Sequence, residues 1–217
     1  MSYADRTKRP PRTLSDAEQA KLLKVSGAKR DDFRDHVILS LALGTGLREG
    51  EICALTVGDV TRDDRRPKRS IQLRHYARKG KRRGKKPTPT DDAAQIVHLP
   101  DGTFYKLEKF LRTKDRFGIA PRELLPDSPL FWSRQGDKGL STRRLRELFA
   151  EWQQRAGFDN RYSFHELRHT AITNAYRRTR DIRIAQRVAR HARIDTTTRY
   201  EHASDQEVAA AVRGLPS

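Results

Sequence analysis

The chain has 217 residues, and its 46 lysine and arginine residues against 28 aspartate and glutamate residues give a formal net charge of +18. So basic a composition predicts a polyanionic partner, nucleic acid first and an acidic membrane surface second. The sequence contains no long apolar run and no apolar signal-peptide core. We therefore expect no membrane span and a cytoplasmic, nucleoid-associated location. Its single cysteine, Cys53, excludes an internal disulfide and a cysteine-based zinc site.

The N-terminal part predicts a basic arm followed by helices. Residues 1–13 are polar and basic and contain two prolines, so we expect a flexible arm or linker before one domain at 14–217. Ser15 and Glu18 have capping-box spacing and open a helix that runs to about residue 25. A second helix is expected over residues 31–43, with an inward stripe formed by Phe33, Val37, Ile38 and Leu41.

Glycines at positions 44 and 46 break the second helix and let the backbone turn sharply towards a ligand. Arg48 then begins a short helix in which Ile52 and Leu55 are expected in the core, and Cys53 is expected to be a buried structural thiol. Glu51 follows Arg48 by three residues, so it can brace the guanidinium, with a plain surface pair as an equal alternative.

Residues 61–90 are the most basic part of the chain, with thirteen lysines or arginines against two aspartates. Alternating apolar and polar residues at 70–76 predict a strand, and residues 95–99 are its expected partner. The glycine-broken run at 78–86 is then the tip of a hairpin. The alternative is a disordered basic tail, which the flanking strands disfavour.

Helical spacing predicts most of the remaining elements. Helices are expected over residues 103–114, from Ser141 onward with Leu145, Leu148, Phe149 and Trp152 in the core, and from Asp181 onward. Thr196 is expected to cap a short helix that carries Tyr200, and residues 204–215 a last helix. The fold class is therefore mainly α with a small antiparallel β-sheet (α+β).

Residues 163–200 carry the most informative pattern. Ser163 and Glu166 form another capping box, and His165 and Arg168 fall on one face of the first turns, where a helix start attracts an anion. His191 comes 23 residues after Arg168, and Tyr200 nine residues later. Each residue alone is more often structural, but two imidazoles, a guanidinium and a phenol together suit attack on a phosphodiester.

These motifs resemble the signature of the tyrosine recombinase, or phage-integrase, family over nearly the whole chain from about Thr13. That signature has an arginine in Gly-Leu-Arg, a hairpin lysine, His-x-x-Arg, a second histidine and a tyrosine nucleophile. The matching residues in this sequence are Arg48, Lys79, His165, Arg168, His191 and Tyr200. One departure is Arg190, where the family commonly has glycine before the second histidine. Such an arginine can change the local turn or add a phosphate contact.

The resemblance implies the tyrosine recombinase catalytic-domain fold and a site-specific DNA recombinase or integrase. Arg48, Arg168 and His191 would bind the scissile phosphate, and Tyr200 would attack it to form a 3′-phosphotyrosyl link. Tyr200 must lose its proton, for which His165 is the nearest candidate acceptor. Lys79 would protonate the leaving 5′-oxygen, with Lys81, Lys85 and Lys86 as competitors. The other basic tip residues would bind the DNA backbone: Arg78, Lys81, Arg82, Arg83, Lys85 and Lys86.

The implied chemistry needs no cofactor such as ATP, because the ester energy is retained in the protein–DNA link. No metal is expected either, because the carboxylates near the site are too few, and too mixed with arginines, to hold Mg²⁺. The expected partner is double-stranded DNA, on which the protein would act as a homotetramer. The segment 204–215 would dock either on a neighbouring subunit or on its own domain. Two other functions remain open: a type IB topoisomerase-like enzyme that reseals the same strand, and a non-catalytic DNA-binding regulator. The separate N-terminal core-binding domain that most family members have is not expected in this chain.

Overall fold

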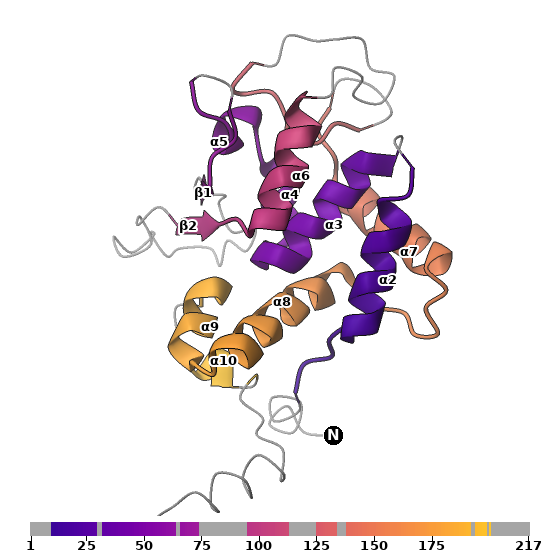
Figure 1. Cartoon of the computed structure of the whole chain (residues 1–217), viewed down its shortest axis with the longest axis vertical. Coiled ribbons are helices and arrows are strands. Elements are labelled where there is room, and N and C mark those ends of the chain that lie inside the picture. The colour runs from indigo at the N-terminus through magenta and orange to yellow at the C-terminus, as the bar shows by residue number, and fades with distance from the viewer. Residues whose placement is uncertain are drawn as a thin grey trace, which may run out of the picture.

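The computed structural model describes residues 10–29, 32–63, 66–73, 95–112, 125–133, 138–191, 194–198 and 200. These residues form helices with one small sheet (Figure 1). The helices are α2 (Asp16–Ser26), α3 (Phe33–Thr45), α4 (Glu49–Ala54), α5 (Val57–Val60), α6 (Asp101–Arg112), α7 (Thr142–Arg155), α8 (Phe164–Thr179), α9 (Ile182–Ala189) and α10 (Asp195–Thr198). The strands are β1 (Ser70–Leu73) and β2 (Gln95–His98). The predicted class, mainly α with a small antiparallel sheet, is confirmed.

Helix α3 lies at the centre of the main hydrophobic core. It packs against α2, α4, α6 and α8 (Figure 1). Val37, Ile38 and Leu41 are fully buried in this core, as their spacing predicts. The core continues through Phe110 of α6 and Phe149 of α7. A helix that is apolar on most sides is stable only when neighbours surround it, and α3 therefore forms the centre against which the other helices pack.

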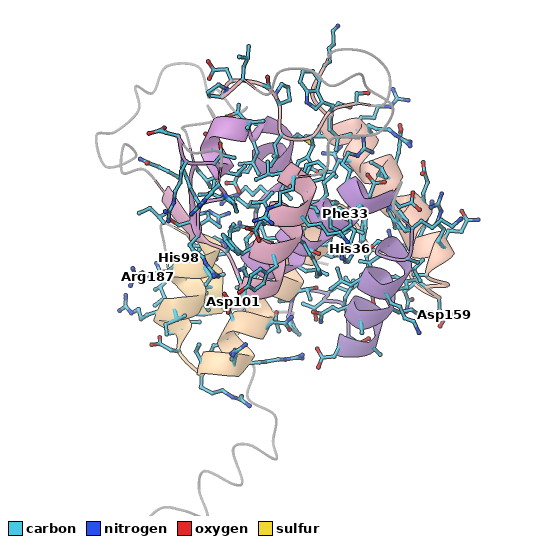
Figure 2. All side chains as sticks on the ribbon, turned by 45° about the horizontal axis from the view of Figure 1, so that its top comes forward. Phe33, His36, His98, Asp101, Asp159 and Arg187 are labelled. Atoms are coloured by element: carbon cyan, nitrogen blue, oxygen red, sulfur yellow. The ribbon has the colours of Figure 1, made fainter. Side chains whose placement is uncertain are left out.

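Buried polar groups on α3 are paired with its neighbours. Phe33 and His36 project from α3 (Figure 2), and Nδ1 of His36 lies 2.9 Å from the hydroxyl of Ser26 on α2. Burial, followed by Lys106 and Lys109, lowers the pKa of His36 to about 4, so this imidazole is neutral at pH 7. The indole of Trp152 on α7 donates to Asp35 at 3.3 Å. Paired in this way, these polar groups add specificity to the helix packing.

Several helix starts lie where the sequence predicts them. Ser15 caps α2, and its side chain and that of Glu18 satisfy each other's backbone N–H groups. The backbone N–H of Ser163 donates to the Glu166 carboxylate at the start of α8. Asp181 caps α9, accepting from two backbone N–H groups at 2.7 and 3.2 Å. These local bonds replace those that the first turn lacks, which is why short polar signals fix the helix boundaries.

The two strands pair as predicted from their alternation. Ile71 lies opposite Val97, and Leu73 opposite Gln95, in an antiparallel register. Ile71 and Val97 are buried, so one face of the sheet joins the core. The basic run at 78–86 therefore joins two paired strands. Its residues, and the predicted helix at 204–215, lie outside the described residues.

Several details differ from the sequence expectations. Gly44 lies inside α3 instead of breaking it, and Gly46 alone ends the helix. The four-residue α5 was not predicted, because so short a helix shows no periodicity. Tyr200 follows α10 instead of lying on it, and Thr196 is inside that helix instead of capping it. Cys53 is half-buried instead of fully buried, although burial, reinforced by Glu49, raises its pKa to about 12 and keeps the thiol protonated. Within the described ranges, no helix combines the length and apolarity needed to cross a bilayer.

Candidate active site

The turn after α3 positions Arg48. Gly46 ends α3 with a φ of 62°, a left-handed conformation that suits glycine. Arg48 then caps α4, where its backbone N–H and its guanidinium each donate to the Glu51 carboxylate at 2.7 Å. The Arg48 side chain stays 39% exposed, so its remaining N–H groups are available to a ligand. Glu51 thus contacts both the backbone and the side chain of Arg48.

Arg168 lies deep beneath this turn, on the second turn of α8. The residue is only 3% exposed, and its guanidinium donates to the carbonyl oxygens of Gly46, at 2.5 Å, and of Ala189. It therefore ties α8 to the ends of both α3 and α9. Burial, followed by the charges of Arg48 and Arg190, lowers the pKa of Arg168 to about 9. The group remains charged at pH 7.

Arg190 adopts a conformation that glycine would adopt more easily. It caps α9 with a φ of 52°, which costs a non-glycine residue roughly 1–2 kcal/mol. Its buried guanidinium donates to Glu51 at 2.8 Å and to the Gly46 carbonyl at 3.3 Å. Its Nε has no partner among the described residues. The turn thus keeps the shape that a glycine would give it, and the arginine side chain reaches back to Glu51.

Two guanidinium groups, those of Arg48 and Arg190, therefore contact one carboxylate, that of Glu51, and Arg168 lies within reach of its charge. Burial alone would raise the pKa of Glu51, but Arg190 and Arg48 outweigh it and lower that pKa. The carboxylate is ionised at pH 7 and neutralises only part of the charge of Arg48, Arg168 and Arg190. The cluster keeps a net positive charge, which favours an anion at the exposed side of Arg48.

Tyr200 belongs to a second, smaller hydrophobic cluster. It is 5% exposed and packs with Ile172 of α8 and with Ala185 and Ala189 of α9. The ring of His191 stacks near that of Tyr200, with centroids 6.5 Å apart and an interplanar angle of 27°. In Figure 1 the helices α8, α9 and α10 lie together below α3. The cluster joins α8 and α9 with Tyr200, which follows α10.

The hydroxyl of Tyr200 meets a histidine that the family signature does not include. Nδ1 of His169 lies 2.6 Å from this hydroxyl. His165 is exposed, and its ring meets that of His169 edge-on with centroids 4.6 Å apart. His191 has its own Nδ1 3.0 Å from the hydroxyl of Thr197. The sequence held one signal for His169: it follows His165 by four residues and so shares its helical face.

The structure thus brings together Arg48, Glu51, Arg168, His191 and Tyr200, which the sequence predicts, and places the predicted His165 beside His169. It adds His169 to the site and shows that Arg190 contacts Glu51. The hairpin candidates lie outside the described residues: Arg78, Lys79, Lys81, Arg82, Arg83, Lys85 and Lys86. Among the described side chains, none gather as three or more histidines, cysteines and carboxylates in a metal-binding arrangement.

Comparison with known proteins identifies the family. Residues 12–207 match the Phage integrase family. The chain belongs to this family. Its sequence is 28% identical over 209 residues to tyrosine recombinase XerC of Corynebacterium efficiens, covering 95% of this chain and 59% of that protein. The chain thus spans about three fifths of that relative's length.

Solved structures agree with this assignment. The chain aligns with XerA recombinase at 25% identity and a TM-score of 0.68. The alignment covers 96% of this chain and 67% of the XerA chain. It aligns with the Tn1549 transposon integrase, solved with a circular intermediate DNA, at 20% identity and a TM-score of 0.71, covering 96% and 67%. The second likeness bears on the fold alone. The predicted tyrosine recombinase catalytic-domain fold is confirmed.

Proposed function

We propose that this chain is the catalytic part of a site-specific DNA recombinase, which cleaves and rejoins DNA strands through a 3′-phosphotyrosyl intermediate. One observation carries the proposal. The hydroxyl of Tyr200 is hydrogen-bonded to an imidazole, on the same helix that carries the buried Arg168 of the arginine cluster. A phenol beside a proton acceptor and an anion-binding group is what nucleophilic attack on a phosphodiester requires.

The arginines would bind the scissile phosphate. Arg48 is partly exposed, and its planar guanidinium can donate two parallel hydrogen bonds to phosphate oxygens. Arg168 adds fixed positive charge behind it, and His165 and His191 are further donors from the same group of helices. Removing one such donor from an enclosed site typically costs about 3–4 kcal/mol of transition-state stabilisation.

Cleavage and rejoining would each exchange one phosphate ester bond for another. Tyr200 attacks the phosphorus, the bond to the 5′-oxygen breaks, and a lysine of the β1–β2 hairpin, Lys79 in this proposal, protonates that oxygen. The 3′-phosphotyrosyl link keeps the ester energy, so the 5′-hydroxyl of another strand can attack it and release Tyr200. These steps involve only groups of the chain and the DNA.

Double-stranded DNA is the proposed partner, and the proposed location is the cytoplasm, in association with the nucleoid. The net charge of +18 supports a polyanion, and the Tn1549 integrase with the same fold was solved with DNA. The lysines and arginines at 78–86 would contact the backbone, so that binding weakens as salt rises.

The proposal is tested with nicked duplexes tiled across the DNA that flanks the gene, because a nick traps cleaved product. We expect a covalent protein–DNA adduct that resists denaturant and a product with a free 5′-hydroxyl. Adding a strand with a different 5′-hydroxyl end should transfer the DNA to that strand and release the protein. Binding to the duplexes with no adduct on any of them would refute the catalytic proposal.

The hairpin acid makes a separate prediction. We expect Lys79→Ala to slow cleavage of ordinary DNA by about 10²-fold or more, the usual contribution of a general acid. A substrate with a 5′-thio leaving group needs little protonation, so its cleavage should change far less. Lys81→Ala is the matched control and should mainly weaken binding. Equal losses on both substrates after Lys79→Ala would assign the role to another lysine.

We also propose that the protein assembles as a homotetramer on DNA, with residues 204–215 docked on a neighbouring subunit. The segment carries a short apolar stripe, at Val208, Ala209, Val212 and Leu215, that a helix of this length must bury to be stable. Deleting 204–217 should then leave a folded monomer and abolish assembly on DNA in sedimentation experiments. A truncated protein that unfolds, or that assembles normally, would mean that the segment packs on its own domain.

A further inference from the structure

The contact between Tyr200 and His169 has a geometry suited to proton transfer. The hydroxyl and Nδ1 are 2.6 Å apart, at the short end of hydrogen bonds of this type. Both partners are held in place. Tyr200 is buried and donates its backbone N–H to the Thr197 carbonyl at 3.0 Å, and His169 lies on α8 between the buried Arg168 and Thr170.

We infer that His169 is a catalytic residue that accepts the Tyr200 proton when the phenol attacks the phosphorus. The inference rests on the proposed function and adds a residue to it. In the attack, the O–H bond of Tyr200 breaks, Nδ1 of His169 gains the proton, and the phenol oxygen bonds to phosphorus as the 5′-oxygen leaves. On rejoining, the incoming 5′-hydroxyl gives its proton back to Lys79 as its oxygen bonds to phosphorus, and the departing phenol oxygen recovers its own proton from His169.

The other two imidazoles are less well placed for this step. Nδ1 of His191 lies 3.0 Å from the Thr197 hydroxyl, and its ring stacks alongside the ring of Tyr200. His165 is exposed, and its ring adjoins that of His169 edge-on. His169 places its Nδ1 within hydrogen-bond distance of the Tyr200 hydroxyl. His165 and His191 are left as donors to the phosphate oxygens.

The surrounding charge favours the same transfer. Burial, Arg48 and Arg190 lower the pKa of Arg168, and a negative charge on the Tyr200 oxygen acts in the opposite direction. Arg168 therefore lies close enough to Tyr200 for the two charges to interact. By reciprocity, Arg168 stabilises the phenolate that begins to form as the proton leaves. Arg48 and Arg190 add positive charge nearby. The proton thus leaves a group whose charged form is stabilised.

The decisive variant is His169→Asn. An asparagine oxygen can stand near the position of Nδ1 and accept a hydrogen bond, but an amide does not take up a proton in this pH range. We expect the variant to fold and to bind the nicked duplex as the wild type does. Its single-turnover rate of adduct formation should fall by about 10²-fold or more. The matched control is His98→Asn, on an exposed histidine of β2 (Figure 2), and it should leave the rate unchanged.

A second variant separates proton transfer from simple support of the tyrosine. His169→Ala leaves a space beside the hydroxyl, and added imidazole should restore at least roughly a tenth of the lost rate, in proportion to its unprotonated form. A His169→Asn rate within about threefold of the wild type would overturn the inference. So would a slow His169→Ala variant that imidazole does not accelerate, since His169 would then only hold Tyr200. The proposed function fails differently, with no adduct from the wild type.

Discussion

Replacing Tyr200 by phenylalanine should leave a folded protein that binds DNA but forms no covalent link to it. Phenylalanine keeps the ring that packs among Ile172, Ala185 and Ala189, so the small cluster is retained. The change removes the hydroxyl, which is the proposed nucleophile, and leaves Nδ1 of His169 without this partner. We expect a loss of stability of about 1 kcal/mol and an adduct yield below detection. The adduct is measured on denaturing gels, and DNA binding is measured separately.

Tyr176→Phe is the matched control for this prediction. Tyr176 is on α8 and packs, partly buried, against the same cluster. Its hydroxyl has no role in the proposed chemistry, so the adduct yield should match that of the wild type. An adduct formed in unchanged yield by Tyr200→Phe would show that another residue attacks the phosphate.

Glu51→Gln should greatly reduce both the stability and the cleavage rate, because it removes the carboxylate that Arg48 and Arg190 contact. The Arg190 and Glu51 side chains are 5% and 13% exposed, so their pair is shielded from water. Leaving a buried charge without its partner typically costs about 3–5 kcal/mol of unfolding free energy. Arg48 also loses its brace, and a misplaced phosphate-binding group typically slows a reaction about 10²-fold. Chemical denaturation and single-turnover cleavage measure the two effects.

The pH dependence gives this prediction a definite sign. The folded protein lowers the pKa of Glu51, so this carboxylate stabilises the fold above its unfolded pKa. That contribution should be lost as the pH falls through the lowered, folded value. Glu51→Gln should therefore flatten the acid limb of the stability curve. Glu147→Gln, on an exposed carboxylate of α7, is the control and should leave the unfolding midpoint unchanged.

Arg190 provides a further check within the same cluster. In the Glu51→Gln background, Arg190→Gly removes the stranded guanidinium and gives the left-handed position the residue that suits it. The double variant should therefore recover part of the lost stability. A Glu51→Gln protein as stable as the wild type would contradict the whole description of this cluster.

Much of the fold could be predicted from local signals. The capping boxes at Ser15 and Ser163 fix helix starts through bonds within four residues, and the inward stripe of α3 follows from helical spacing. The paired strands β1 and β2 follow from alternation. The four-residue α5 could not be predicted, because packing and not periodicity forms it.

The candidate site also combines contacts that the sequence predicts with contacts that it does not. Arg48 and Glu51 are three residues apart, so their contact follows from helix geometry. The contact between His169 and Tyr200 joins positions 31 residues apart and depends on the path from α9 through the turn after α10. The reach of Arg190 to Glu51 spans 139 residues and depends on how α9 docks against the turn after α3. Such long-range contacts are set by packing that no local motif encodes.

The central claim is that Tyr200 becomes joined to a DNA 3′-phosphate. It is tested most directly by isolating the adduct formed on a nicked duplex, digesting protein and DNA, and locating the attached nucleotide by mass spectrometry. We predict a single modified residue, Tyr200, linked to a 3′-phosphate with a free 5′-hydroxyl on the released strand. A nucleotide attached to any other residue, or to a 5′-phosphate, would contradict the account.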